Sequence, residues 1–179
     1  MEKKIAVLGL GPSVVEFMAQ PKAYQETIGV NDNWRFWHTD YLVCLDRKEK
    51  FNDVRRKVID ESRPRHFYTH LDEWQDRADY RPITLQFGYP QHECVLEGEA
   101  LPKSLCSPFV ACAIAYKLLG ANELHMFGVD LVDHPHLRDV SVKHIVKHFV
   151  NLQRALILKG ARIVVHGKGM LLVLNSIRQ

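Results

Sequence analysis

Paired cysteines and long hydrophobic runs are both missing from this sequence. No C-x-x-C spacing occurs, which favours reduced thiols in the core at the four cysteines, Cys44, Cys94, Cys106 and Cys112. No segment approaches the length of a membrane span, and the apolar run 5–8 is too short for the apolar region of a signal peptide. The sequence therefore predicts a cytoplasmic protein without a membrane span.

A strong excess of charge of one sign is also missing. Lys and Arg number 24 against 21 Asp and Glu, which leaves a formal charge of +3, and the basic residues are scattered along the chain. We therefore expect no nucleic-acid partner. Neither internal repeats nor low-complexity tracts are visible. With 179 residues, 46% of them hydrophobic, the chain is large enough for one core, so we expect a single domain over residues 1–179.

Two common nucleotide-binding fingerprints are incomplete. Gly9 and Gly11 follow the first apolar run, but Val14 stands where the dinucleotide pattern G-x-G-x-x-G needs a third glycine. No Walker lysine follows the glycines either. These absences disfavour NAD binding and the chemistry of P-loop ATPases.

Short apolar runs alternate with helix-like segments along the chain. Strands are predicted at 5–8, 27–30, 41–45, 66–68, 83–87, 123–127 and 162–165. Helices are predicted at 14–18, 48–60, 107–119 and 140–158, and residues 88–104 are expected to form a loop or flap. Strands that alternate with helices predict an α/β protein, a three-layer Rossmann-like fold with a mostly parallel central sheet.

Polar residues follow several of the predicted strands. In an open parallel sheet, ligands bind beyond the carboxyl ends of the strands, so these positions are the candidates for a site. The glycine turn and the helix after it, capped by Ser13, can direct backbone N–H groups at a phosphate. A tight turn without a ligand is the alternative. The candidate residues are Gly9, Leu10, Gly11, Pro12 and Ser13, then Asn31 with its neighbours Asp32 and Asn33, then Asp46, and finally Asp130.

Four segments together resemble a known family. They are Gly-x-Gly-Pro-Ser at 9–13, Val30-Asn31, Ser107-Pro108 opening an Ala-rich helix, and Phe127-Gly128-Val129-Asp130. This succession resembles the bacterial sialyltransferases and the related MptE-like (DUF115) proteins. The resemblance implies a Rossmann-like nucleotide-binding domain. Its ligand would be a cytidine-monophosphate sugar in the sialyltransferases and ATP in the archaeal pterin diphosphokinases.

The resemblance also implies roles for single residues. The loop 9–13, Asn31 and Ser107 would hold the nucleotide, with Asp130 at the edge of the site. Leu10 departs from the family, where an asparagine between the two glycines usually contacts the donor. The family's catalytic histidine would fall at or beside His144, with His148 one helical turn further on. Two solvated histidines on a helix are the alternative.

The family's phosphate-stabilising tyrosines have no counterpart after Asp130. His134, His136 and Arg138 are the candidate substitutes, and Arg138 is the best phosphate partner because its charge is permanent. The same stretch offers a different hypothesis. Asp130, Asp133 and the two histidines are ligand types that could hold a divalent metal beside a diphosphate.

Three functions follow as hypotheses. The leading one is a nucleotide-sugar-dependent glycosyltransferase related to sialyltransferases, with a CMP-type ligand and no metal. The second is an MptE-like ATP-dependent diphosphokinase, which would use Mg²⁺. The third is a non-catalytic nucleotide-binding domain. The sequence leaves the oligomeric state open, with a homo-oligomer as one option.

Overall fold

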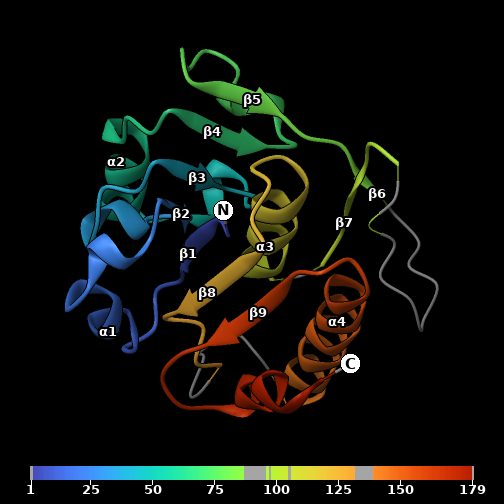
Figure 1. The fold of residues 1–179 in the computed structure, drawn as a ribbon. Coiled ribbons are helices and arrows are strands. Elements are labelled where there is room, and N and C mark those ends of the chain that lie inside the picture. The colour runs from blue at the N-terminus through green and yellow to red at the C-terminus, as the bar shows by residue number, and fades with distance from the viewer. Residues whose placement is uncertain (1, 87–95, 97, 105, 132–138, 179) are drawn as a thin grey trace.

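A parallel sheet forms the centre of the molecule in the computed structural model (Figure 1). The structure describes residues 2–86, 96, 98–104, 106–131 and 139–178, and of residues 139–141 the backbone only. The sheet has seven strands in the order β5-β4-β3-β2-β1-β8-β9, and every neighbouring pair is parallel. Its strands are β1 (Lys4–Leu8), β2 (Glu26–Val30), β3 (Tyr41–Val43), β4 (His66–Thr69), β5 (Tyr80–Pro82), β8 (Glu123–Phe127) and β9 (Arg162–Val165).

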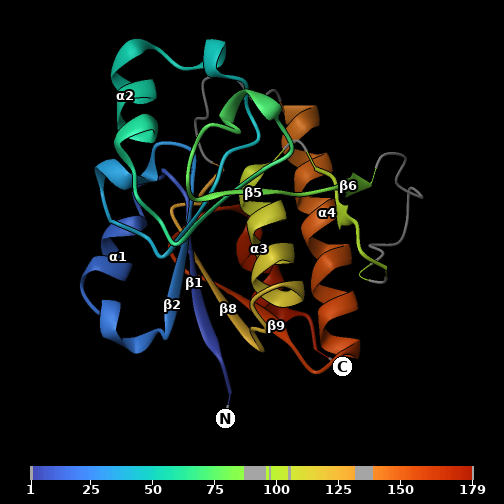
Figure 2. The same ribbon diagram turned by 90° about the horizontal axis from the view of Figure 1, so that it is seen from above.

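Helices cover both faces of this sheet. Figure 2 shows α1 (Val14–Met18) and α2 (Asp53–Glu61) on one side, and α3 (Ser107–Lys117) and α4 (Asp139–Leu158) on the other. The predicted α/β class and its three-layer Rossmann-like arrangement are therefore confirmed. A second, two-stranded sheet pairs β6 (Leu85–Gln86) with β7 (Leu101–Pro102) in parallel.

The two helices on one face of the sheet, α3 and α4, differ in how much of their surface is buried. Residues 109–115 of α3 are all fully buried, and small alanines allow the helix to lie close to β1 and β2. In α4 the buried residues recur at helical spacing, at Ile145, Phe149, Leu152 and Leu156. Gly160 follows α4 with φ +76°, a conformation that glycine adopts without a Cβ clash, so the chain reverses there into β9.

The order of strands determines where a ligand can bind. From β1 the chain adds β2 to β5 on one side and then returns to place β8 and β9 on the other. The direction of winding therefore reverses at β1 and β8, and a crevice is expected beyond the carboxyl ends of these strands. We call the segments that follow the carboxyl ends of the sheet strands the rim.

The expected loop at 88–104 falls mostly outside the described residues. Its described part contains β7, and Lys117 of α3 donates hydrogen bonds to the backbone oxygens of Gly98 and Ala100 at 2.8 Å each. The predicted strand 83–87 was only partly right. The chain forms β5 at Tyr80–Pro82 and the short β6 at Leu85–Gln86 instead.

Candidate functional site

The loop after β1 packs directly against the loop after β8. Gly9 N–H donates to Phe127 O and Gly11 N–H donates to Gly128 O, both over 2.8 Å. A Cβ built on Gly9 would lie 2.2 Å from Gly128 O, and one on Gly11 would lie 2.4 Å from an oxygen of Asp130. Both glycines are thus required by close approach of two backbones, which is a structural reason for the Gly-x-Gly pattern.

The N–H groups of this loop are largely used within the protein. Besides those of Gly9 and Gly11, the N–H of Ser13 donates to the carboxylate of Asp130 at 3.1 Å. Pro12 has no N–H, so Leu10 carries the one N–H of residues 9–13 that has no partner in the described part of the chain. Of the N–H groups that were expected to bind a phosphate, the Leu10 amide is therefore the one left to do so in this arrangement.

Ser13 stands at the predicted N-cap position of α1, but its side chain bonds elsewhere. Its side chain makes no capping bond to α1, and its Oγ instead accepts a hydrogen bond from Gly128 N–H at 2.7 Å. Gly167, after β9, packs on the same spot, since a Cβ there would lie 2.3 Å from the Cβ of Ser13. Ser13 thus joins the loops that follow β1, β8 and β9.

The turn after β2 contacts both the loop after β1 and the loop after β3. The amide Nδ2 of Asn33 donates to Gly9 O at 2.7 Å, and Nδ2 of Asn31 lies 3.4 Å from Oδ2 of Asp46, after β3. Asn31 has φ +52°, a left-handed conformation that asparagine tolerates better than most residues. The structure therefore brings together the predicted residues of the β1, β2, β3 and β8 loops.

Several buried oxygen atoms at this rim lack a hydrogen-bond partner in the described part of the chain. They are Oδ1 of Asn31, Oδ1 of Asn33, Oγ1 of Thr39 and Oδ1 of Asp130. Leaving a buried acceptor unpaired costs about 1–3 kcal/mol, so such atoms are rare unless water or a ligand satisfies them. All of them can accept a hydrogen bond. Because Asn33 and Thr39 are at most 2% exposed, the N–H and O–H groups of a ligand would meet Asn31 and Asp130 first.

Glycine in β2 makes room for two of these atoms. A Cβ on Gly29 would lie 2.9 Å from both Oδ1 of Asn33 and Oγ1 of Thr39. Both side chains are nearly fully buried. Any larger residue at position 29 would therefore displace them.

Asp32 carries a fully buried charge that is neutralised from α2. Nε and Nη2 of Arg55 donate to Oδ1 of Asp32 at 3.0 and 2.6 Å, and Arg35 Nε lies 3.4 Å from its Oδ2. The hydrogen bond to Asp32 raises the pKa of Arg55. Arg55 therefore belongs to this buried ion pair rather than to a solvated helix face. Arg56 is half-buried and pairs with the exposed Asp53 at 2.6 Å.

His70 directly follows β4. Burial, with a contribution from the charge of Lys103, lowers the pKa of His70, while Asp46 acts in the opposite direction. Nδ1 of His70 is buried without a partner among the described residues.

The predicted catalytic histidines lie on α4, and the structure distinguishes them. His148 is half-buried, with Nδ1 3.2 Å from Oγ of Ser104, just before the predicted nucleotide residue Ser107 at the start of α3. Burial, followed by the nearby His144 and Lys147, lowers the pKa of His148. His144 is exposed. The predicted phosphate and metal residues Asp133, His134, His136 and Arg138 lie outside the described residues.

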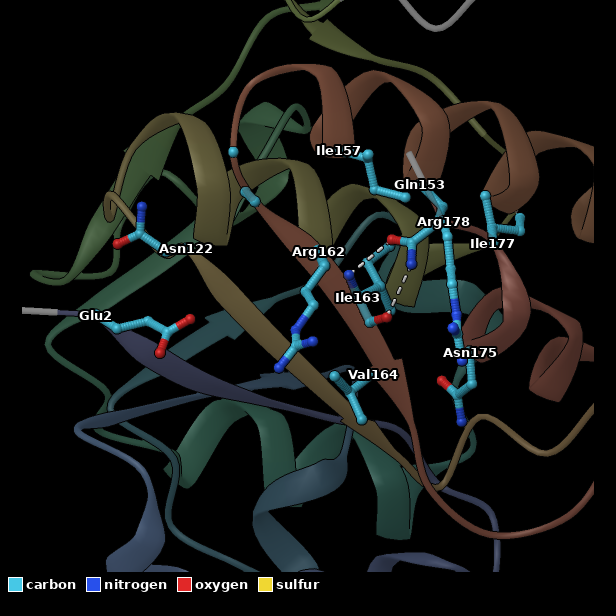
Figure 3. Close-up of a pocket in the computed structure, with 12 residues that line it drawn as sticks. Glu2, Asn122, Gln153, Ile157, Arg162, Ile163, Val164, Asn175, Ile177 and Arg178 are labelled. Carbon is cyan, nitrogen blue, oxygen red and sulfur yellow. Dashed lines mark hydrogen bonds between the residues drawn. The ribbon is translucent and has the colours of Figure 1, made fainter.

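A pocket of about 850 Å³ lies at the opposite, amino end of β8 and β9, away from the rim (Figure 3). On its wall the Gln153 side chain pairs with Ile163 of the edge strand β9. Its Oε1 accepts from Ile163 N–H at 2.7 Å and its Nε2 donates to Ile163 O at 3.1 Å. Asn175 pairs with Val165 in the same way, at 2.8 and 2.9 Å. These amides satisfy the backbone groups that an edge strand exposes.

Sequence reasoning missed two histidines that follow strands of the sheet. His166 comes directly after the predicted strand 162–165, and His70 comes two residues after the predicted strand 66–68, so both carry a positional signal. Asp32 and Asn33 were named together with Asn31, but nothing in the sequence distinguishes their separate bonds to Arg55 and Gly9.

The fold is similar to that of a solved glycosyltransferase. The sialyltransferase CstII from Campylobacter jejuni, solved with the substrate analogue CMP-3FNeuAc, matches with a TM-score of 0.51 and 14% sequence identity. The match covers 92% of this chain and 79% of that chain. At this identity the similarity establishes the shared fold. No family model matches the chain, and no curated protein matches its sequence.

None of the helices that the structure describes combines the length and the apolar character that crossing a bilayer requires. Among the described residues, no group of three or more His, Cys, Asp or Glu side chains has the geometry of a metal site. The metal hypothesis for residues 130–136 stays a prediction, because most of that stretch lies outside the described residues.

Proposed function

We propose that the chain is a nucleotide-sugar-dependent glycosyltransferase that binds a CMP-type donor at the rim. The observation that supports this most is the pair of buried, unpaired oxygens of Asn31 and Asp130 beside the point where the sheet reverses its winding. Ribose hydroxyls and the amino group of cytosine are donors that such acceptors can satisfy. The fold of a CMP-sugar-binding sialyltransferase makes this ligand class the first to test.

The donor would extend across several strands. Its nucleoside would lie by the β2 and β3 loops, at Asn31 and Asp46, and its phosphate near the Leu10 amide and the start of α3 at Ser107. On the α3 and α4 side of the sheet, His148 would be available to the acceptor, with Ser104 holding its ring.

Binding to a panel of nucleotides tests this proposal. CMP and CMP-sugars are expected to raise the melting temperature without a metal, more than UMP, AMP or GMP do. A ligand at 100 times its Kd adds about 2.7 kcal/mol of stability, which a thermal scan resolves. Stabilisation by ATP only, and only with Mg²⁺, would overturn the proposal in favour of a diphosphokinase.

A substitution at position 31 locates the site. Asn31→Gly keeps the left-handed backbone accessible and deletes the amide, so the fold should persist while CMP affinity falls at least tenfold. Asn122→Ala is the matched control, because the exposed Asn122 lies just before β8 at the amino end of the sheet. Unchanged CMP affinity in Asn31→Gly would remove the rim from the proposal.

A further inference from the structure

Three ionisable side chains form a continuous hydrogen-bonded chain across β8 and β9. Nε2 of His125 lies 2.6 Å from Oε1 of Glu123, and Nδ1 of His125 lies 2.8 Å from Nε2 of His166. Glu123 and His125 are two residues apart on β8 and so point to the same face of the sheet. We call this arrangement the Glu123–His125–His166 relay.

The carboxyl end of the relay is held in its charged form. Glu123 is 3% exposed and receives Arg162 Nη2 at 2.6 Å and Lys4 Nζ at 3.0 Å. Burial alone would raise the pKa of Glu123, but its bonds to Arg162, His125 and Lys4 lower it to about 2. Near neutral pH the group is therefore a carboxylate, which can only accept hydrogen bonds.

This charge determines which nitrogen of each ring carries a proton. Because Glu123 accepts, Nε2 of His125 must donate, and Nδ1 of the neutral His125 ring is left as an acceptor. His166 then donates from Nε2 to that atom. In the neutral ring of His166 the remaining lone pair is on Nδ1, which has no hydrogen-bond partner in the described part of the chain and is not buried.

The ring of His166 is fixed at the rim. It stacks on Phe127 with centroids 4.1 Å apart and an angle of 11°, while Tyr24 contacts the ring of His125 at 5.0 Å. The residue after His166 is Gly167, which packs on Ser13 and Asp130. Three strand spacings, or about 14 Å, separate β2 from β9, a span that a nucleotide joined to one sugar can cover.

We propose that Nδ1 of His166 takes the proton of the acceptor hydroxyl, and that His125 and Glu123 position it for this task. The inference rests on the proposed function for its substrate. As the hydroxyl oxygen bonds to the anomeric carbon of the donor sugar, the bond from that carbon to the phosphate oxygen breaks and CMP leaves with the electron pair, while the hydroxyl proton bonds to Nδ1 of His166. The Nε2 proton of His166 passes to Nδ1 of His125, and the positive charge then lies on His125 beside the carboxylate of Glu123.

The relay and His148 lie on opposite faces of the sheet. The rings of the relay pack with Phe127, which contacts Phe17 of α1, whereas His148 is on α4 and bonds to Ser104. Figure 2 shows α1 and α4 on opposite sides. Because one hydroxyl cannot reach both histidines in the same reaction, substitutions can identify which of them accepts the proton.

Imidazole NMR tests the relay without any turnover. Two-bond ¹H–¹⁵N spectra of the full chain near pH 7.5 should show both His125 and His166 protonated at Nε2 and bare at Nδ1. A proton on Nδ1 of His166 would overturn the inference even if the protein binds CMP. The charged and titratable groups that face these rings are Glu16 of α1, Glu123 of β8, Arg162 of β9 and Lys4 of β1.

Turnover of a CMP-sugar then tests the separate roles of His166 and His125. His166→Gln keeps an amide donor for His125 but cannot take a proton, so it should bind the donor normally and lose at least 100-fold in kcat. His125→Gln should shift the pH profile of kcat, which a structural role alone would not do. His38→Gln, at an exposed position, is the matched control.

The outcomes separate the two proposals. Loss of kcat in His148→Gln, with His166→Gln unaffected, would overturn the relay and leave the glycosyltransferase in place. If no CMP-sugar binds to the wild type, the proposed function fails, and with it the role of His166 as proton acceptor for the sugar's acceptor hydroxyl. The tautomers measured by NMR then still decide whether Glu123, His125 and His166 are joined by hydrogen bonds.

Discussion

The carboxylate of Asp130 accepts a hydrogen bond from the backbone N–H of Ser13, a residue 117 positions earlier in the chain, over 3.1 Å. A negative side chain thus stands beside the glycine loop, where the sequence alone had suggested the phosphate of a ligand. Asp130 therefore helps to hold the rim together, and its negative charge also affects which ligand can bind beside the glycine loop.

Replacing Asp130 should destabilise the protein more when the hydrogen-bond acceptor is removed than when only the charge is removed. Asp130→Ala removes the acceptor of a buried N–H, which costs about 1–3 kcal/mol. Asp130→Asn keeps an acceptor oxygen and removes the charge, so its loss of stability should be smaller. Urea denaturation of the two variants measures the difference, and equal stability of Asp130→Ala and the wild type would contradict this account of the contact.

Two glycines should respond very differently to alanine. In Gly9→Ala the new Cβ would lie 2.2 Å from Gly128 O, so two loops must separate and we expect a loss of several kcal/mol. Gly160→Ala meets nothing within 4 Å but keeps φ +76°, which costs about 1–2 kcal/mol. Melting temperatures of the pair provide the comparison, and a similar drop in both would argue against the close packing of the two loops.

The amide of Gln153 should protect the edge of the sheet. Gln153→Leu leaves the N–H and C=O of Ile163 without their partner, and we expect about 2 kcal/mol less stability and more self-association. Gln75→Leu, at an exposed position, is the control for added hydrophobic surface. Light scattering at several concentrations, together with urea denaturation, checks both effects.

Stability should fall in acid because of Glu123. Its pKa is lowered from 4.5 to about 2 by folding, so the contribution of its ion pairs is present above pH 4.5 and is lost as pH falls toward 2. Allowing for the partly solvated Arg162, this contribution is about 2 kcal/mol. Denaturation midpoints between pH 2 and 7 should show a flatter profile for Glu123→Gln than for the wild type. A parallel profile would contradict the assignment.

Much of the fold could be predicted because it depends on local patterns. Apolar runs followed by glycine correspond to β1 and β8, the run that ends before Asn31 corresponds to β2, and helical spacing identifies α4. β5 was missed because it is an edge strand with exposed residues at Arg81 and Pro82, so it carries no buried apolar signal.

The site could be predicted only in outline. The rule that ligands bind beyond the carboxyl ends of parallel strands located the loops around Asn31 and Asp130, and the structure shows them joined through Gly9, Asn33 and Gly11. That rule does not reveal which N–H groups are already used. The partners of Ser13 and of His125 lie on distant parts of the chain, so their bonds follow from tertiary structure alone.

The position of β1 has a consequence for synthesis on the ribosome. In the chain β2 follows β1 closely, whereas β8 begins only at Glu123. One edge of β1 can therefore pair with β2 early, while the other stays open until β8 has been made, whose register joins Leu8 to Phe127. Contacts between residues so far apart in the sequence also form slowly. A nascent chain of this protein should therefore depend on chaperones until β8 has emerged from the ribosome.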